Sequence, residues 1–144
     1  MGSYGKEIRK QYGLELTKVG GRMMIDIEVF DIGFARKEKA TIDEARQLAT
    51  KITEGFIQKI NSDEEIRPYL HDFPITRKNV NIHIRFDKSK NEPKGSPFAY
   101  YVTVANNKIY YDAYDNSDPS NGQIVDFVQE PYDQALKIVQ ETSR

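Results

Sequence analysis

His83 and Arg85 are the side chains whose types and spacing come nearest to a site for chemistry. They stand two residues apart in a segment that alternates apolar and polar residues, and side chains at i and i+2 of a strand project from the same face. An imidazole beside a guanidinium can hold an anion such as a carboxylate. The alternative is a solvated outer strand face, on which such residues are common.

A β-hairpin over residues 98–116 supplies the neighbours of this pair. Asn106-Asn107 separates two segments rich in Tyr, Val, Thr and Ile, and Asn tolerates the positive φ that a two-residue primed turn requires. A turn at these two residues fixes the register of the hairpin. The expected pairs are Ala105 with Lys108, Val104 with Ile109, Thr103 with Tyr110, Val102 with Tyr111, Tyr101 with Asp112 and Tyr100 with Ala113.

The two faces of the hairpin differ in chemistry because side chains alternate across a strand. The apolar face, expected in the core, carries Phe98, Tyr100, Val102, Val104, Ile109, Tyr111 and Ala113. If the strand at 80–86 lies beside the one at 98–105, the polar face joins Asn81, His83 and Arg85 to Tyr101 and Thr103. Tyr and Arg are enriched at binding hot spots, although cross-strand tyrosines also stabilise solvent-facing sheets. The predicted ligand- or partner-binding residues are His83, Arg85, Tyr101, Tyr110, Asp112 and Tyr114.

Other groups that invite a chemical interpretation lack the pattern it requires. His71-Asp72 suggests a base with an orienting carboxylate, but adjacent residues seldom pair and no nucleophile motif accompanies them. Asp112, Asp115 and Asp118 suggest calcium, but their spacing does not fit an EF-hand, and turn chemistry explains them. The chain has two histidines and no cysteine, and its glycines form no phosphate-binding loop. We therefore expect no metal, no cofactor and no catalytic residue.

Composition and charge describe an ordinary globular chain. The 144 residues carry 21 basic and 22 acidic side chains, so no net field favours nucleic acid as a partner. No apolar segment is long enough to span a bilayer. Met1-Gly2-Ser3 resembles a remnant of an expression vector, so a leader or lipid-attachment segment is expected to have been trimmed. An exported or periplasmic location is favoured, with the cytoplasm as the alternative.

A helix over residues 41–60 is the most clearly patterned element. Thr41 and Glu44 match a capping box, in which the Thr41 hydroxyl accepts from the backbone N–H of residue 44. Apolar residues then recur at spacings of three and four, which predicts a side that lies against a sheet. Gly55 weakens the helix and is expected to allow close approach to a strand. The buried side comprises Ala45, Leu48, Ala49, Ile52, Phe56 and Ile60.

A strand precedes this helix. Residues 23–34 alternate but change phase at Val29-Phe30, which predicts a β-bulge. Gly20-Gly21 is expected to close a hairpin between this strand and residues 14–19. Residues 1–12 are expected to form a loose arm or a short helix, so residues 13–144 make up the single domain.

After the helix, a short second helix within residues 61–76 is expected to end near Leu70. A strand over 80–86, a polar loop, the hairpin and an edge strand over 123–128 follow. A final helix starts at Pro131, and its buried side is expected to hold Ala135, Leu136, Ile138 and Val139.

This order predicts the α+β class, with a curved antiparallel sheet packed on one long helix in the order β-α-α-β-β-β-α. A strand, a helix and then an antiparallel meander resembles the layout of cystatin-like folds. The chain has no cystatin inhibitory motif, so this resemblance implies a topology and no function.

Two segments also resemble uncharacterised bacterial proteins that are expected to be exported. The segments are residues 60–71 and 132–139, which include Arg67-Pro68-Tyr69-Leu70-His71. The resemblance implies a bacterial source and an envelope location, and it supplies no activity.

Two functions fit these observations. The favoured one is a non-catalytic interaction module that binds a protein, or a second copy of itself, through the aromatic face of the sheet. The alternative is a small enzyme or ligand carrier with a pocket between helix and sheet, which would use His83, Arg85 or His71. The accessibility of the hairpin tyrosines distinguishes the two.

Overall fold

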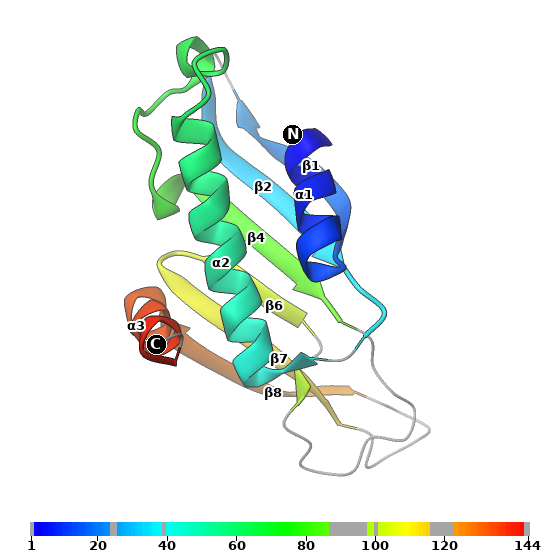
Figure 1. Ribbon diagram of the computed structural model, residues 1–144. Helices are drawn as coiled ribbons and strands as arrows, with labels where there is room; N and C mark the ends of the chain where they lie inside the picture. The colour runs from blue at the N-terminus through cyan, green and yellow to red at the C-terminus, as the bar shows by residue number, and fades with distance from the viewer. Residues whose placement is uncertain are drawn as a thin grey trace.

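A six-stranded sheet with helices on one side forms the framework of the protein (Figure 1). The structure is a computed structural model that describes residues 2–23, 26–38, 40–86, 98–99, 101–115 and 123–142. The strand order in the sheet is β1-β2-β4-β6-β7-β8. The strands are β1 (Glu15–Met23), β2 (Ile27–Ala35), β4 (Val80–Arg85), β6 (Tyr101–Ala105), β7 (Lys108–Asp115) and β8 (Gln123–Pro131).

The helices and two very short strands complete the described elements. Strands β3 (Ala40–Thr41) and β5 (Phe98–Ala99) pair with each other and tie the start of the long helix to the segment before β6. The α-helices are α1 (Gly2–Tyr12), α2 (Ile42–Asn61) and α3 (Tyr132–Thr142), and the 3₁₀ helices are η1 (Arg67–Tyr69) and η2 (Arg77–Asn79).

The sheet confirms the predicted α+β class, and one strand pair gives it a mixed character. Strand β2 lies parallel to β4, and every other neighbouring pair is antiparallel. The parallel pair arises because α2 carries the chain back across the sheet between the two strands, as a crossover connection must. The predicted meander of β4, β6, β7 and β8 follows it (Figure 1).

Helix α2 forms where the sequence predicts it. The backbone N–H of Glu44 donates to Thr41 Oγ1 at 3.1 Å, so Thr41 caps the helix. All six residues of the predicted apolar side are buried. Gly55, which was expected to face a strand, instead lines a hollow between α1 and α2.

The β6–β7 hairpin has the predicted register. Asn106 and Asn107 have φ values of 55° and 60° and form the turn, and the five predicted pairs from Ala105–Lys108 to Tyr101–Asp112 are all present. Tyr100, and with it the sixth pair, lies outside the described residues. Within the described part of the apolar face, Val102, Val104, Ile109 and Tyr111 are buried.

The β1–β2 hairpin corrects one prediction. Gly20-Gly21 does not form its turn, because β1 continues through both glycines to Met23. The chains approach closely there, and a Cβ at Gly21 would collide with the carbonyl oxygen of Val29. A register shift places Glu28 as an extra residue opposite β1, just before the phase change that predicted a bulge.

In the segment between α2 and β4, the short helix expected to end near Leu70 is the 3₁₀ helix η1, which ends at Tyr69 with Leu70 as its C-cap. Pro68 lies in the first turn of η1 and cannot donate a backbone hydrogen bond. Two asparagines hold the segment in place. Asn61 Oδ1 accepts from the backbone N–H of Ile75 at 2.8 Å, and Asn79 Oδ1 accepts from the N–H of Thr76 at 2.9 Å.

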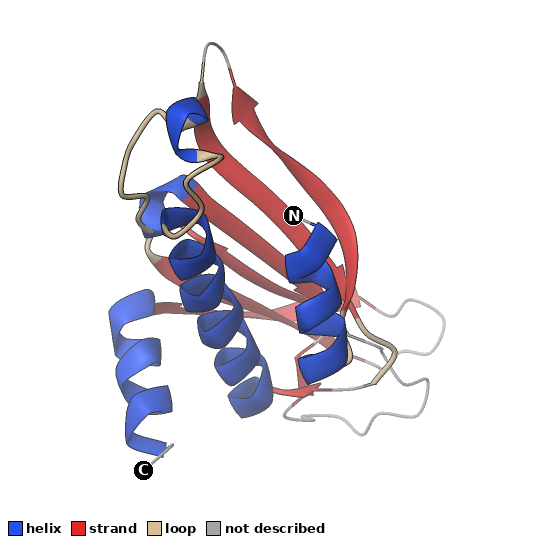
Figure 2. Ribbon diagram, turned by 45° about the horizontal axis from the view of Figure 1, so that its top comes forward, coloured by secondary structure: helices blue, strands red, loops and turns tan. Residues whose placement is uncertain are grey.

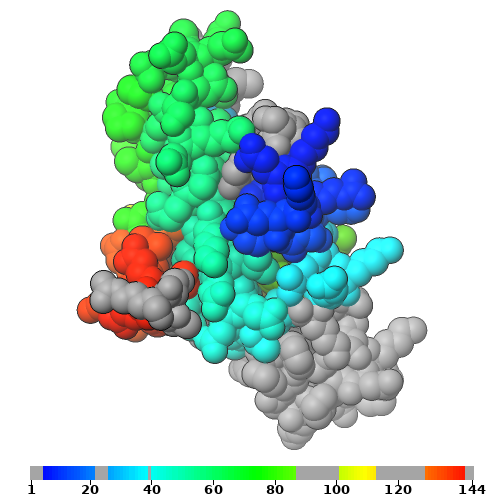
Figure 3. All heavy atoms as spheres, in the orientation of Figure 1, coloured from blue at the N-terminus to red at the C-terminus, as the bar shows by residue number. Residues whose placement is uncertain are grey.

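All three α-helices cover the same face of the sheet (Figure 2), and their atoms make up much of the surface seen in Figure 3. The residues expected to be a loose arm or short helix form α1, whose Ile8 is buried in the core. Helix α3 packs beside α2, where the Tyr132 hydroxyl donates to Glu54 Oε1 at 3.1 Å. It buries Ala135 and Val139, while Leu136 and Ile138 are half-buried. Within the described residues, no helix has the length and apolar character needed to cross a membrane.

Candidate functional site

The candidate site lies on the face of the sheet opposite the helices. Residues that pair across strands project from the same face, so the register places residues of β2, β4, β6 and β7 in two rows, the first of which continues to β8. The first row is Gly33, His83, Thr103, Tyr110 and Gln129, and the second is Ala35, Arg85, Tyr101 and Asp112.

This arrangement brings five of the six predicted residues onto one face. Arg85 is exposed, and His83, Tyr101, Tyr110 and Asp112 are half-buried. None of these five lies beneath a described helix, because the helices pack on the apolar face. The sixth, Tyr114, belongs to β7 and pairs with Ile124, but its side chain lies outside the described residues. We call the face formed by His83, Arg85, Tyr101, Thr103, Tyr110 and Asp112 the open face.

A hollow of about 190 Å³ lies at the β1 end of the open face. Its floor depends on Gly33, because a Cβ there would lie 3.1 Å from Thr17 Oγ1 and 3.2 Å from Lys18 Cβ. Thr17 is an extra residue in the register of β1 with β2, and both Thr17 and Lys18 therefore reach the same side as Gly33. The rim is completed by Phe34, Ala35, His83, Arg85 and Tyr101.

Asp31 contacts two basic side chains, His83 and Lys18, beside this hollow. Its Oδ1 lies 2.8 Å from His83 Nε2, and its Oδ2 lies 3.3 Å from Lys18 Nζ. The His83 Nδ1 atom is buried and has no hydrogen-bond partner among the described residues. The His83 ring also lies 6.1 Å from the Tyr101 ring. The hollow therefore combines cationic, aromatic and hydroxyl groups.

Asp112 is the acidic group at the other side of the open face. Burial raises the pKa of its carboxyl group above the ordinary value. Among the described residues, no hydrogen bond or ion pair offsets this desolvation. Tyr101 lies directly opposite it on the neighbouring strand, so the open face carries a partly desolvated carboxylate beside an aromatic ring.

Replacing Asp112 with asparagine is expected to stabilise the protein at pH 7. A raised pKa in the folded state means that the ionised carboxylate disfavours folding at every pH above that pKa. This cost disappears as the pH falls through the folded pKa towards the unfolded value of about 3.9. Urea unfolding should therefore show a gain for Asp112→Asn at pH 7 that shrinks to nothing near pH 3.

Asp43→Asn is the matched control for this prediction. Asp43 is exposed and pairs with Arg46 at 2.7 Å, so the same substitution should there be neutral or slightly destabilising. A loss of stability for Asp112→Asn at pH 7 would show that a favourable interaction holds the carboxylate.

His71 lies far from the open face. Its partner is Asp26 and not the adjacent Asp72, which the sequence had suggested. His71 Nδ1 lies 3.1 Å from Asp26 Oδ1, and the hydrogen bond to Asp26 and its charge raise the pKa of His71. Asp72 instead accepts from Asn79 Nδ2 at 2.9 Å, which lowers the pKa of Asp72. Asp118, part of the aspartate group considered for calcium, lies outside the described residues.

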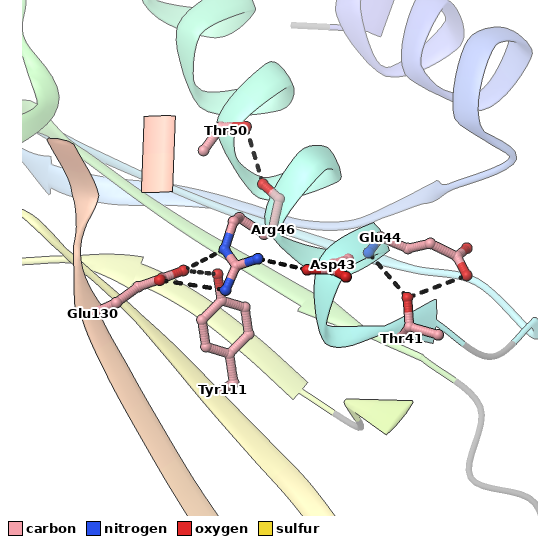
Figure 4. A network of polar contacts seen from close by, with 7 residues as sticks. All are labelled: Thr41, Asp43, Glu44, Arg46, Thr50, Tyr111 and Glu130. Atoms are coloured by element: carbon pink, nitrogen blue, oxygen red, sulfur yellow. Dashed lines mark hydrogen bonds and ion pairs between the residues drawn. The ribbon is translucent and has the colours of Figure 1, made fainter. Parts of the chain in front are cut away.

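A second polar cluster lies between α2 and the β7–β8 edge and has a structural role (Figure 4). Glu130 Oε1 accepts hydrogen bonds from Arg46 Nε at 2.7 Å and from the Tyr111 hydroxyl at 2.5 Å. The side chains of Arg46 and Glu130 are 15% and 13% exposed. Burial raises the pKa of the Tyr111 phenol, so the cluster holds a neutral phenol against one buried ion pair.

Sequence reasoning missed the residues of β1 and β2 that lie beside the open face, around the hollow and His83. Thr17, Lys18, Asp31 and Gly33 reach His83 only because β2 pairs in parallel with β4. The alternation of Phe30, Ile32 and Phe34 towards the core was the signal that Asp31 and Gly33 face outwards.

Comparison of the chain with models of protein families, with curated proteins and with solved structures found no match.

Proposed function

We propose that this protein is a non-catalytic binding module that engages a protein partner through the open face. The observation that carries this proposal is that all described helices pack on one side of the sheet, while Tyr101, Tyr110, His83 and Arg85 lie together on the other. Among the described residues, no helix covers this face of the sheet, and tyrosine and arginine are enriched at binding hot spots.

The chemistry of the open face suits a polar protein surface. Tyrosine rings offer a large contact area at a low cost in side-chain entropy, and arginine binds carboxylates with paired hydrogen bonds. The partly desolvated Asp112 carboxylate would gain from a basic side chain of the partner. The open face thus offers an aromatic centre between Arg85 and Asp112, the arrangement that hot spots favour.

The dimensions of the hollow favour a surface contact over an enclosed small ligand. Its volume of about 190 Å³ is below the range of about 300–1,000 Å³ that is usual for ligand pockets. The space between α2 and the sheet, where the enzyme or carrier alternative requires a pocket, is occupied by buried apolar side chains such as Ile52, Phe56 and Ile82. The hollow between α1 and α2 is larger, but no histidine lines it.

The double variant Tyr101→Ala, Tyr110→Ala tests the proposal. Wild-type and variant proteins are immobilised at equal density, and captured proteins are quantified by mass spectrometry. We expect the variant to lose its specific partners, with a loss of more than about 2 kcal/mol in binding free energy if both rings are hot spots. Circular dichroism checks that the variant remains folded.

Tyr69→Ala provides the matched control, because Tyr69 is a 64% exposed tyrosine outside the open face. It should retain every partner that the wild type captures. Equal recovery of all partners by the double variant would contradict the proposal. If the partner is a second copy of the chain, sedimentation should show a wild-type dimer that the double variant converts to a monomer.

A further inference from the structure

Three metal-ligating side chains converge at the end of the molecule where β2 begins. Asp26, Glu28 and His71 each offer one ligand atom, and these atoms all lie within 4.8 Å of one another. In the part of the chain that the structure describes, no other trio of His, Cys, Asp or Glu residues comes this close. The set combines one imidazole with two carboxylates, and the imidazole comes from a segment 45 residues away.

Backbone contacts hold the two segments together at this point. Leu70 forms a parallel bridge with Ile27, and the backbone N–H of His71 donates to the Ile27 carbonyl at 2.9 Å. Ile27 lies between Asp26 and Glu28 in the sequence. The backbone hydrogen bond from His71 to Ile27 therefore places the His71 side chain near both carboxylates. The backbone therefore helps to bring the three side chains together, beside the direct contact between His71 and Asp26.

The buried side chain of Asn79 also holds the backbone near this cluster in place. Its side chain is buried, and its Nδ2 donates to the Glu28 carbonyl at 3.0 Å and to Asp72 Oδ2 at 2.9 Å. The first bond fixes the backbone at Glu28. The second engages Asp72, which leaves Asp26 and Glu28 as the carboxylates that face His71. Rigid support of this kind is what orients the ligands of metal sites.

The second histidine of the chain shows why this cluster differs from an ordinary ion pair. His83 also contacts an aspartate, Asp31, but the other oxygen of Asp31 lies 3.3 Å from the Lys18 ammonium. The Asp31 carboxylate there already has the Lys18 ammonium as a cationic partner. At His71, the second group that approaches is the carboxylate of Glu28, so this cluster offers three possible metal ligands where the other site has a single carboxylate beside a histidine and a lysine.

The donor set, one imidazole and two carboxylates, selects the class of ion. His71 Nδ1 lies 3.1 and 3.2 Å from the two Asp26 oxygens, close to the edge of about 3.3 Å between ligands of a tetrahedral Zn²⁺ with bonds of about 2.0 Å. We propose that Asp26, Glu28 and His71 form a site for a borderline divalent ion of the Zn²⁺ class, with water as the fourth ligand. Mg²⁺ and Ca²⁺ favour sites made only of oxygen ligands, so the imidazole disfavours them.

Zn²⁺ titration of the untagged, chelator-treated protein in competition with a chromogenic chelator tests this site. We expect saturable binding of one ion per chain that a large excess of Mg²⁺ does not displace. The variants Asp26→Asn, Glu28→Gln and His71→Gln should each weaken binding by at least the ~10–100-fold that loss of an outer-shell partner costs. His83→Gln, which removes the other histidine–aspartate contact, should bind Zn²⁺ like the wild type.

Nuclear magnetic resonance of the histidine rings gives an independent readout. One equivalent of Zn²⁺ should shift the Nδ1 resonance of His71 and leave the ring nitrogens of His83 in place. The proposal is overturned if no saturable site is found, if His71→Gln binds Zn²⁺ as the wild type does, or if His83→Gln loses the binding. The site lies outside the open face, so its failure would leave the proposed partner-binding function untouched.

Discussion

Replacing Glu130 with alanine is expected to lower the free energy of unfolding by about 3–5 kcal/mol. The Glu130 carboxylate accepts from Arg46 Nε at 2.7 Å and from the Tyr111 hydroxyl, and all three groups are largely removed from water. Without Glu130, a largely buried guanidinium loses one of its two carboxylate partners, and the buried Tyr111 phenol loses its acceptor. The loss exceeds that of an ordinary hydrogen bond because, among the described residues, only the exposed Asp43 carboxylate is then left beside a largely buried guanidinium.

Urea unfolding followed by circular dichroism measures this effect, and the second carboxylate of Arg46 supplies the control. Asp43 Oδ1 also lies 2.7 Å from the guanidinium, but its side chain is 82% exposed. Asp43→Ala should therefore cost no more than about 1 kcal/mol. The prediction is wrong if the two alanine variants are equally stable.

A triple apolar variant separates two contributions to stability. One is the cost of leaving Arg46 and Tyr111 without Glu130, and the other is the stabilisation that the intact polar cluster provides. Arg46→Met, Tyr111→Phe and Glu130→Leu together remove every partner, so no buried polar group is left without an acceptor. We expect this variant to recover most of the stability that Glu130→Ala loses, because apolar replacements of buried ion pairs are often neutral or stabilising. A triple variant less stable than Glu130→Ala would mean that the network itself stabilises the fold.

Phe56→Ala is the second substitution with a large expected effect, about 3–5 kcal/mol of unfolding free energy. Phe56 is fully buried on α2, and its ring meets the Phe30 ring of β2 at 5.3 Å between centroids with an angle of 73°. Alanine loses the transfer free energy of the ring, the edge-to-face contact and the packing around it, because the neighbouring sheet and helix can close only part of the cavity.

Phe56→Leu is the graded control, because it keeps an apolar side chain of moderate size. We expect it to cost less than half as much as Phe56→Ala when both are compared with the wild type in urea at the same pH. Similar losses for the two variants would show that the edge-to-face contact with Phe30, rather than the cavity volume, dominates this part of the core.

The elements that the sequence predicted well are those whose signals lie within a few residues. The Thr41 cap, the buried side of α2 and the Asn106-Asn107 turn each depend on neighbours in the chain. Once a tight turn is fixed, the alternation of a strand sets both its register and its two faces. The position of five predicted open-face residues followed from that local geometry and from the neighbouring strand β4.

The predicted turn at Gly20-Gly21 was wrong because glycine occurs in two different structural situations. Gly20-Gly21 looks like a turn because glycine tolerates turn conformations, but glycine also permits close approach of two chains. At Gly21 the second reason applies, since a Cβ would collide with the Val29 carbonyl. The sequence contains the same residue in both cases, and only the position of the partner strand distinguishes them.

The sequence alone therefore determined which side chains share a strand or helix face, because periodicity is a property of the backbone. The tertiary structure decided which faces meet. The crossover through α2 placed β2 parallel to β4 and brought Asp31 and Lys18 to His83, and the bridge at Ile27 brought His71 to Asp26. Such pairings depend on the packing of the whole core and on the entropy lost when long segments of chain are closed into loops. The pattern of a few neighbouring residues does not reveal these contributions.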